Sequence, residues 1–104
     1  MTHILIAEDE PRISAFVSRG LEAAGADAVE VGIPFSDPVM DGSVIQEASR
    51  MALEAGTRPA DVLATVAEAD LAIPAVTMTY YNPVLRTGED RFLGEAAAAG
   101  VRGA

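Results

Sequence analysis

Two carboxylates, Glu30 and Asp41, stand where acid–base chemistry could take place. Glu30 lies in the middle of segment 28–33, whose alternation predicts a strand with its apolar side chains on the opposite face. A carboxylate on a buried strand costs free energy unless it is paired or functional. Asp41 follows in the loop 34–42, together with Asp37, and can place a second carboxylate opposite Glu30. Paired carboxylates suit general acid and base catalysis, so these residues are candidate catalysts.

Both candidates also have a simpler interpretation. Glu30 could face water on an open side of the sheet, where its charge would cost little. Asp37 and Asp41 precede Pro38 and Gly42, and Asp-Pro and Asp-Gly pairs are common turn formers. The sequence alone leaves both interpretations open.

A second acidic pair, Glu8 and Asp9, follows the apolar run 4–7, which predicts the first strand. Ligands of parallel α/β sheets bind beyond the carboxyl ends of the strands, and carboxylates there can hold Mg²⁺. The alternative is a solvated acidic loop before a helix, where negative charge is favoured. Glu8 and Asp9 are therefore candidates for a weak Mg²⁺ site, and we expect no other cofactor.

The composition excludes several other kinds of chemistry. The chain has no cysteine and no glycine-rich phosphate loop, and its one histidine, His3, is interpreted as a surface residue. A net charge of -9 argues against nucleic-acid binding. No apolar run approaches the roughly 20 residues of a membrane span. The opening residues lack a basic segment followed by an apolar one, so we expect no secretory signal. We expect a cytoplasmic protein without a membrane partner.

Strand and helix patterns alternate along the chain in the order β-α-β-α-α-β-α. Strands are predicted at 4–7, 28–33 and 75–81, and Tyr80 and Tyr81 are interpreted as core and rim residues of the third. Alternation of this kind predicts a three-stranded parallel sheet with right-handed crossovers in a single small α/β domain, 1–104. Thr57 is the predicted cap of the second of the two consecutive helices, and the last helix spans about 88–99. The apolar stripes of the three helices after the second strand are assigned to the core: Val44, Ile45, Ala48, Met51, Ala52, Val62, Leu63, Val66, Phe92, Leu93 and Ala96.

The first quarter of the chain resembles the start of a response-regulator receiver domain. The resemblance rests on His3-Ile4-Leu5-Ile6-Ala7-Glu8-Asp9-Glu10-Pro11-Arg12 and Leu21-Glu22-Ala23-Ala24-Gly25. In that family the acidic pair after the first strand binds Mg²⁺ beside a phosphoacceptor aspartate. The resemblance, assigned to residues 1–25, implies that Glu8 and Asp9 would be metal ligands.

The remaining residues, 26–104, resemble the α subunit of tryptophan synthase, a TIM barrel. One matching block runs from Gly25-Ala26-Asp27-Ala28-Val29-Glu30-Val31-Gly32-Ile33-Pro34-Phe35-Ser36-Asp37-Pro38 to Gly42, and a second is Met78-Thr79-Tyr80-Tyr81-Asn82-Pro83-Val84. That family cleaves indole-3-glycerol phosphate to indole and glyceraldehyde 3-phosphate. The resemblance implies that its two catalytic carboxylates fall on Glu30 and Asp41.

Departures from both families shape the functional prediction. The barrel has eight strands, of which about two are matched, and its phosphate site lies on later loops. Ser43 stands where that family commonly has proline, and the receiver's phosphoacceptor strand has no counterpart here. We therefore expect an engineered or recombined chimera, joined near Gly25, without a complete active site or independent catalysis. The alternatives are a tryptophan synthase α-like lyase and a weak Mg²⁺-binding receiver-like module.

The predicted elements also lead to expectations about the fold and about binding partners. The sheet is predicted to be a partial TIM barrel or a flavodoxin-like fragment, with barrel order 1-2-3 favoured. A helix is expected to end the chain where a fourth strand would follow. Open sheet edges and an exposed inner face predict self-association. Binding of a tryptophan synthase β-like subunit is not expected, although the loop 35–41 resembles the one that faces that partner.

Overall fold

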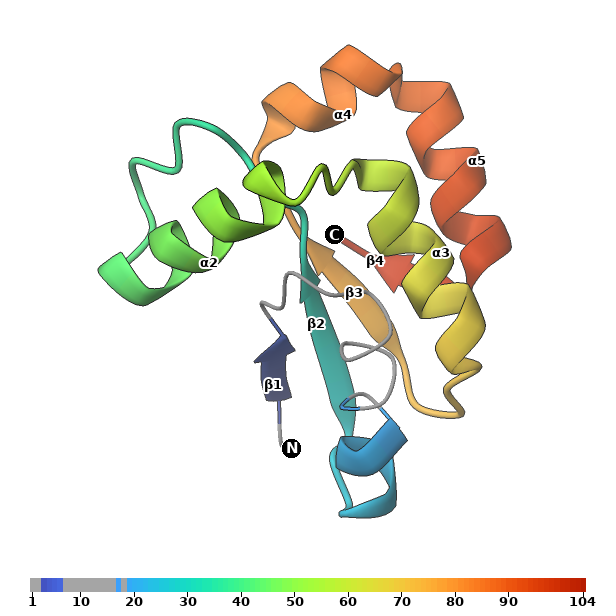
Figure 1. Cartoon of the computed structure of the whole chain (residues 1–104). Helices are drawn as coiled ribbons and strands as arrows, with labels where there is room; N and C mark the ends of the chain where they lie inside the picture. The colour runs from blue at the N-terminus through green and yellow to red at the C-terminus, as the bar shows by residue number, and fades with distance from the viewer. Residues whose placement is uncertain (1–2, 7–16, 18) are drawn as a thin grey trace.

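The backbone forms a parallel sheet flanked by helices (Figure 1). This computed structural model describes residues 3–6, 17 and 19–104. Its strands are β1 (His3–Ile6), β2 (Ala28–Gly32), β3 (Ala75–Met78) and β4 (Val101–Gly103). Its helices are α2 (Ser43–Glu54), α3 (Pro59–Ala69), α4 (Tyr81–Thr87) and α5 (Glu89–Ala99), and residues 19–23 are also helical.

All neighbouring strands run parallel in the order β1-β2-β3-β4. Barrel order is thereby confirmed, and the flavodoxin-like alternative, which sets the third strand beside the first, is wrong. Glu30 occupies the centre of the sheet, since it pairs with Leu5 on one side and Val76 on the other. Gly32 pairs with Met78 at the carboxyl ends of β2 and β3.

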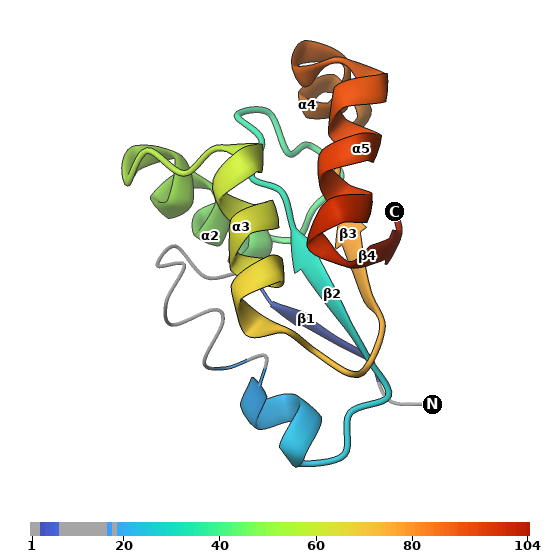
Figure 2. The same cartoon turned by 90° about the vertical axis from the view of Figure 1, so that its right-hand side faces the viewer.

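The core lies on one face of the sheet, under α3 and α5 (Figure 2). Side chains of β2 alternate as predicted, because Val29, Val31 and Ile33 are buried while Glu30 and Gly32 are half-buried. The helices contribute further buried side chains to this cluster: Val62, Leu63 and Val66 from α3, and Phe92 and Ala96 from α5. This burial is the main force that fixes the sheet on the helices.

A polar side chain interrupts this core at Thr77. It is 3% exposed, and within the described part of the chain its Oγ1 has no hydrogen-bond partner. Thr77→Val keeps the shape and removes an unsatisfied hydroxyl, so we expect the free energy of unfolding to rise by about 1 kcal/mol. Urea unfolding measures this change.

Thr65 provides the matched control for that substitution. It is as deeply buried, at 5% exposure, but its hydroxyl donates to the Asp61 carbonyl at 3.0 Å. Thr65→Val should therefore leave stability unchanged or lower it. A loss of stability in Thr77→Val would mean that its hydroxyl has a polar partner, such as water, and would contradict the expectation.

Several predicted boundaries and burials are wrong. A fourth strand follows the last helix, and the third strand ends at Met78, because residues 81–87 form the additional helix α4. Arg58, not Thr57, is the N-cap of α3, and its N–H donates to the Asp61 carboxylate at 2.8 Å.

Three members of the predicted apolar stripes face solvent. Val44, Met51 and Leu93 are 78%, 43% and 60% exposed, so they lie outside the core to which the sequence assigned them. The prediction is confirmed for the α3 stripe, for Ala52 of α2, and for Phe92 and Ala96 of α5.

Helical residues 19–23 are tied to the turn that leads from α3 into β3. The Arg19 guanidinium donates to the carbonyls of Ala69 (3.0 Å) and Glu68 (2.7 Å) at the end of α3. The Glu22 carboxylate accepts from the Ala72 N–H at 3.0 Å. These bonds satisfy backbone groups that a helix end leaves unpaired, and they fix where β3 begins.

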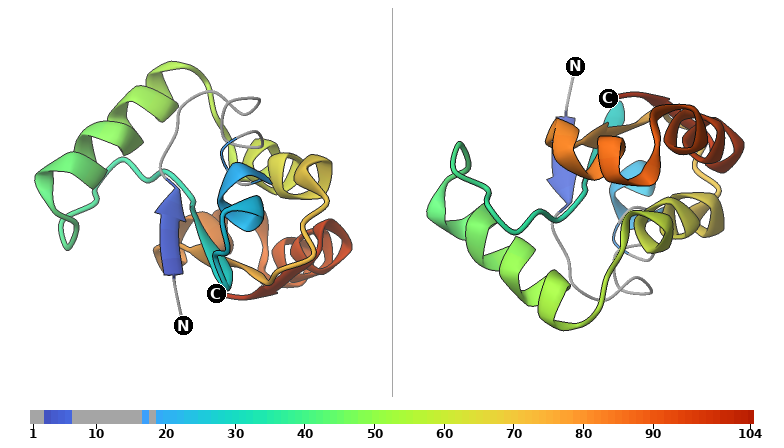
Figure 3. Two further views of the ribbon diagram at one scale, coloured as in Figure 1. Left: turned by 90° about the horizontal axis from the view of Figure 1, so that it is seen from below. Right: turned by 90° about the horizontal axis from the view of Figure 1, so that it is seen from above.

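Helix α2 extends away from α3 and α5 (Figure 3), which leaves room between α2 and the carboxyl ends of the strands. No helix within the described residues is long and apolar enough to span a membrane.

Candidate functional site

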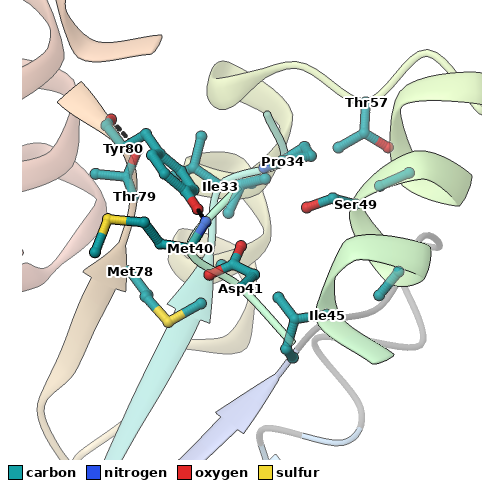
Figure 4. Close-up of a pocket in the computed structure, with 14 residues that line it drawn as sticks. Ile33, Pro34, Met40, Asp41, Ile45, Ser49, Thr57, Met78, Thr79 and Tyr80 are labelled. Atoms are coloured by element: carbon teal, nitrogen blue, oxygen red, sulfur yellow. Dashed lines mark hydrogen bonds between the residues drawn. The ribbon is translucent and has the colours of Figure 1, made fainter. Parts of the chain in front are cut away.

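A cavity opens at the carboxyl ends of β2 and β3, beside α2 (Figure 4). Its volume is about 250 Å³, just below the range of roughly 300–1,000 Å³ that is usual for small-molecule sites. Apolar side chains form most of the wall, with a few hydroxyls and one carboxylate among them. The lining residues are Gly32, Ile33, Pro34, Met40, Asp41, Ile45, Ala48, Ser49, Ala52, Thr57, Val62, Met78, Thr79 and Tyr80.

Asp41 is the carboxylate of this wall. In Figure 4 it lies between Met78 of β3 and Ile45 of α2. The side chain is half-buried, so its charge is partly removed from water and faces an apolar space. A carboxylate in such surroundings is a strong acceptor for an N–H or O–H group of a bound molecule.

Glu30, the other predicted carboxylate, is placed by β2. It lies two residues before Gly32 on the same strand, and alternation puts both on the same face. Gly32 lines the cavity, whereas Glu30 lies deeper along the strand and is half-buried. Glu30 and Asp41 therefore belong to the same β/α unit. Glu30 is on its strand, and Asp41 is in the loop that follows the strand.

Asp37, the third candidate in the loop, lies away from the cavity. Its side chain is exposed and accepts a hydrogen bond from the Ser36 hydroxyl at 3.2 Å. The Asp37 carbonyl also accepts from the Val39 N–H at 2.8 Å. Local turn bonds of this kind fit the simpler interpretation of Asp37.

Tyr80 belongs to the cavity, although its sequence pattern predicts a strand residue without ligand contact. It follows β3 and lines the cavity, and its ring packs on Phe35 with 5.2 Å between the ring centroids. Ser49 and Thr57 also line the cavity and were not predicted. Ser49 could have been predicted to line the cavity, because it directly follows Ala48 of the apolar stripe on α2. Nothing in the local pattern marks Thr57 as a cavity residue.

Charge on the outer side of α2 is locally neutralised. Arg50 bonds Glu47 and also Glu54, the latter at 2.6 Å, and all three side chains are more than half exposed. The hydrogen bond from Arg50 lowers the pKa of Glu47, and its bonds to the two glutamates raise the pKa of Arg50. This network contributes little to stability, because its side chains are solvated. It lies on the side of α2 away from the cavity-lining residues.

The candidate metal ligands Glu8 and Asp9 lie outside the described residues. Within residues 3–6, 17 and 19–104, no group of three or more histidine and acidic side chains is arranged to hold a metal ion.

The sequence model of the tryptophan synthase alpha chain matches this chain over residues 1–104. The chain belongs to the tryptophan synthase alpha chain family. The match continues through residues 1–25, so the comparisons give no support to a receiver-like segment or to a chimera joined near Gly25.

Relatives in this family are similar in sequence over most of the chain. The tryptophan synthase alpha chain of Carboxydothermus hydrogenoformans is 53% identical over 89 residues, which cover 84% of this chain and 33% of the relative. The one from Synechococcus sp. is 44% identical over 105 residues, which cover 99% of this chain and 39% of the relative. The chain thus spans about a third to two fifths of these tryptophan synthase alpha chains.

Solved structures of the same family share the fold. The alpha subunit from Legionella pneumophila is 36% identical, with a TM-score of 0.91 over 97% of this chain and 40% of that one. A mutant alpha subunit from Pyrococcus furiosus is 40% identical, with a TM-score of 0.90 over 98% of this chain and 43% of that one. The four parallel strands of this chain are therefore a portion of a tryptophan synthase alpha barrel.

Proposed function

We propose that this chain carries the carboxylate-bearing part of a tryptophan synthase α-type lyase site. The substrate would be indole-3-glycerol phosphate and the products indole and glyceraldehyde 3-phosphate. The observation that carries the proposal is the position of Asp41 in the wall of an apolar cavity, on the β/α unit whose strand holds Glu30.

The cavity is suited to a flat aromatic ring. Ile33, Ile45 and Met78 supply apolar surface, and Asp41 supplies a hydrogen-bond acceptor among them. An indole has the complementary pattern, because it is apolar over both faces and carries a single N–H donor on its rim. Binding the ring here would pair the indole N–H with the Asp41 carboxylate.

The reaction breaks the carbon–carbon bond between the indole ring and the glycerol chain. A proton must reach the ring carbon, and a proton must leave the hydroxyl on the adjoining carbon, which becomes the aldehyde. The electron pair of the broken bond returns to the ring, which is positively charged at nitrogen after protonation. We assign proton transfer to Glu30 and stabilisation of the positive indole nitrogen to Asp41, and this chemistry requires no cofactor.

The complete activity is proposed for a whole barrel that contains the strands and helices of this chain, because the chain covers only about two fifths of the length of its relatives. Recognition of the distant phosphate contributes binding energy that normally assists the chemistry. The proposal favours the lyase interpretation over the inactive chimera, and the family match across residues 1–104 supports this choice.

A grafted barrel tests the proposal. In it, this chain replaces the 105 matched residues of the Synechococcus relative. We expect the purified grafted barrel to release indole from indole-3-glycerol phosphate. A graft that folds, as shown by a cooperative thermal transition, but releases no indole would contradict the proposal. The chain by itself, assayed in parallel, shows how much of the activity depends on the remaining strands.

Self-association stays a prediction. Among the described strands, β1 and β4 each have one neighbour, and edges of this kind offer unpaired backbone groups to another strand. Leu85 and Leu93 also leave large apolar side chains about 60% exposed. We expect light scattering to give a mass above that of one chain, and a homogeneous monomer at high concentration would contradict this.

A contact with a β subunit and a metal site have less support than the lyase site. Val39 and Met40 are 80% and 87% exposed on the loop that resembles the one facing a β subunit, and we propose that such a subunit would contact these side chains. A weak Mg²⁺ site at Glu8 and Asp9 stays a prediction.

A further inference from the structure

The loop segment that ends in Asp41 is held from two sides. On one side, Tyr80 lies between β3 and α4, and its hydroxyl accepts a hydrogen bond from the Met40 N–H at 2.8 Å, which is drawn in Figure 4. From α2, the Gln46 side-chain amide donates to the carbonyls of Pro38 (3.0 Å) and Asp41 (3.1 Å). A backbone turn closes the segment, because the Asp41 N–H donates to the Pro38 carbonyl at 3.1 Å.

Burial of side chains contributes little at the middle of this segment, whose two ends, Pro38 and Asp41, are half-buried. Val39 and Met40 are 80% and 87% exposed, so they gain little from packing. The position of residues 38–41 therefore depends mainly on polar anchors. The ring of Tyr80 is itself fixed by its contact with Phe35, which makes its hydroxyl a stable acceptor.

We infer that Tyr80 and Gln46 are positioning residues for Asp41. Together they form a loop clamp, defined here as these two side chains and their hydrogen bonds to residues 38–41. The clamp sets the Asp41 carboxylate against the cavity before any ligand binds. This inference rests on the proposed function for its catalytic consequence, since placing a group in advance removes an entropic cost from the reaction.

Amide exchange in the chain itself tests whether the clamp exists. Tyr80→Phe keeps the ring and its contact with Phe35 and removes the acceptor. We expect hydrogen exchange at the Met40 amide, followed by NMR, to become about two- to tenfold faster. Tyr81→Phe is the matched control, because Tyr81 is the next residue, is 57% exposed and does not line the cavity.

Kinetics in the grafted barrel test whether the clamp acts through Asp41. We expect Tyr80→Phe and Gln46→Met each to lower kcat by about tenfold and to leave KM within about twofold. In an Asp41→Asn background the same two substitutions should cause almost no further loss, because the group that they position is absent.

The outcomes separate this inference from the proposed function. Unchanged exchange at Met40 in Tyr80→Phe would overturn the clamp, whatever the kinetics show. Faster exchange with an unchanged kcat, while Asp41→Asn is inactive, would overturn the positioning role and leave the proposed function intact. Equal losses from the clamp variants with and without Asp41 would show a general structural effect and would also overturn it. Full activity of Asp41→Asn would instead overturn the proposed function.

Discussion

Asp41→Asn in the grafted barrel is expected to lower kcat for indole release by about 10²- to 10⁴-fold. Asparagine keeps the size of the side chain but removes the negative charge that would face the indole nitrogen in the apolar cavity. Because the charge matters most when the ring is protonated, the loss should appear in kcat more than in KM. Steady-state kinetics with indole-3-glycerol phosphate measures both parameters.

Glu30→Gln is expected to give a loss of the same size, and the two substitutions together should cost less than the product of the single effects. Groups that act on one transition state are strongly non-additive. Asp90→Asn is the control, since Asp90 is an exposed acid in the first turn of α5 and does not line the cavity. If either carboxylate variant retains more than about half of the parental kcat, its assigned role is wrong.

Phe92→Ala is expected to lower the free energy of unfolding of the chain by about 3–5 kcal/mol. Phe92 is 2% exposed, is one of the two largest fully buried side chains, and packs with α3 and the sheet. Since domains of this size are stable by about 5–15 kcal/mol, this change removes a large part of the total. Urea unfolding followed by circular dichroism measures it.

Leu93→Ala is the matched control on the same helix. Leu93 is 60% exposed, so we expect a change within about 1 kcal/mol. Similar losses for Phe92→Ala and Leu93→Ala would contradict the described packing of α5. The pair also tests the difference between two side chains that the helical pattern alone assigns equally to the core.

Short-range periodicity predicts the first three strands and the buried stripe of α3, but neither β4 nor the exposed positions of α2 and α5. Alternation in β2 predicts the buried face of Val29 and Val31 and puts Glu30 on the other. It cannot separate Phe92 from Leu93, because neighbouring helix positions point about 100° apart and either could face the sheet. Which one does so depends on how α5 packs against α3 and β4, and this is a tertiary property.

The third strand is shorter than its sequence pattern predicts, and the reason is local. Thr79, Tyr80 and Tyr81 have strong strand propensity, and this pattern extended the predicted strand past Met78. Pro83 carried the opposite signal, since proline is well tolerated in the first turn of a helix, which is where it lies in α4. The short strand β4 has only three residues, too few for a periodic pattern to be read.

The sequence marks Glu30 and Asp41 as candidates, and their catalytic roles stay predictions, whereas the surroundings of the site are not predictable from it. Glu30 stands out because a carboxylate within a strand is unusual, and Asp41 because it lies in the loop after that strand, on the side of the sheet where ligands bind. The partnership of Tyr80 with Met40 joins residues that are 40 positions apart, so no local pattern reveals it. The cavity exists because α2 leaves the sheet at this edge, and only the folded arrangement shows that.

The most direct test of the central claim is an NMR titration of the chain with indole. If the cavity beside Asp41 takes the aromatic part of the substrate, amide shifts should concentrate at Gly32, Asp41 and Thr79, and Asp41→Asn should weaken the binding. Shifts that avoid these residues, or binding that is unaffected by Asp41→Asn, would contradict the assignment of this cavity as the indole site.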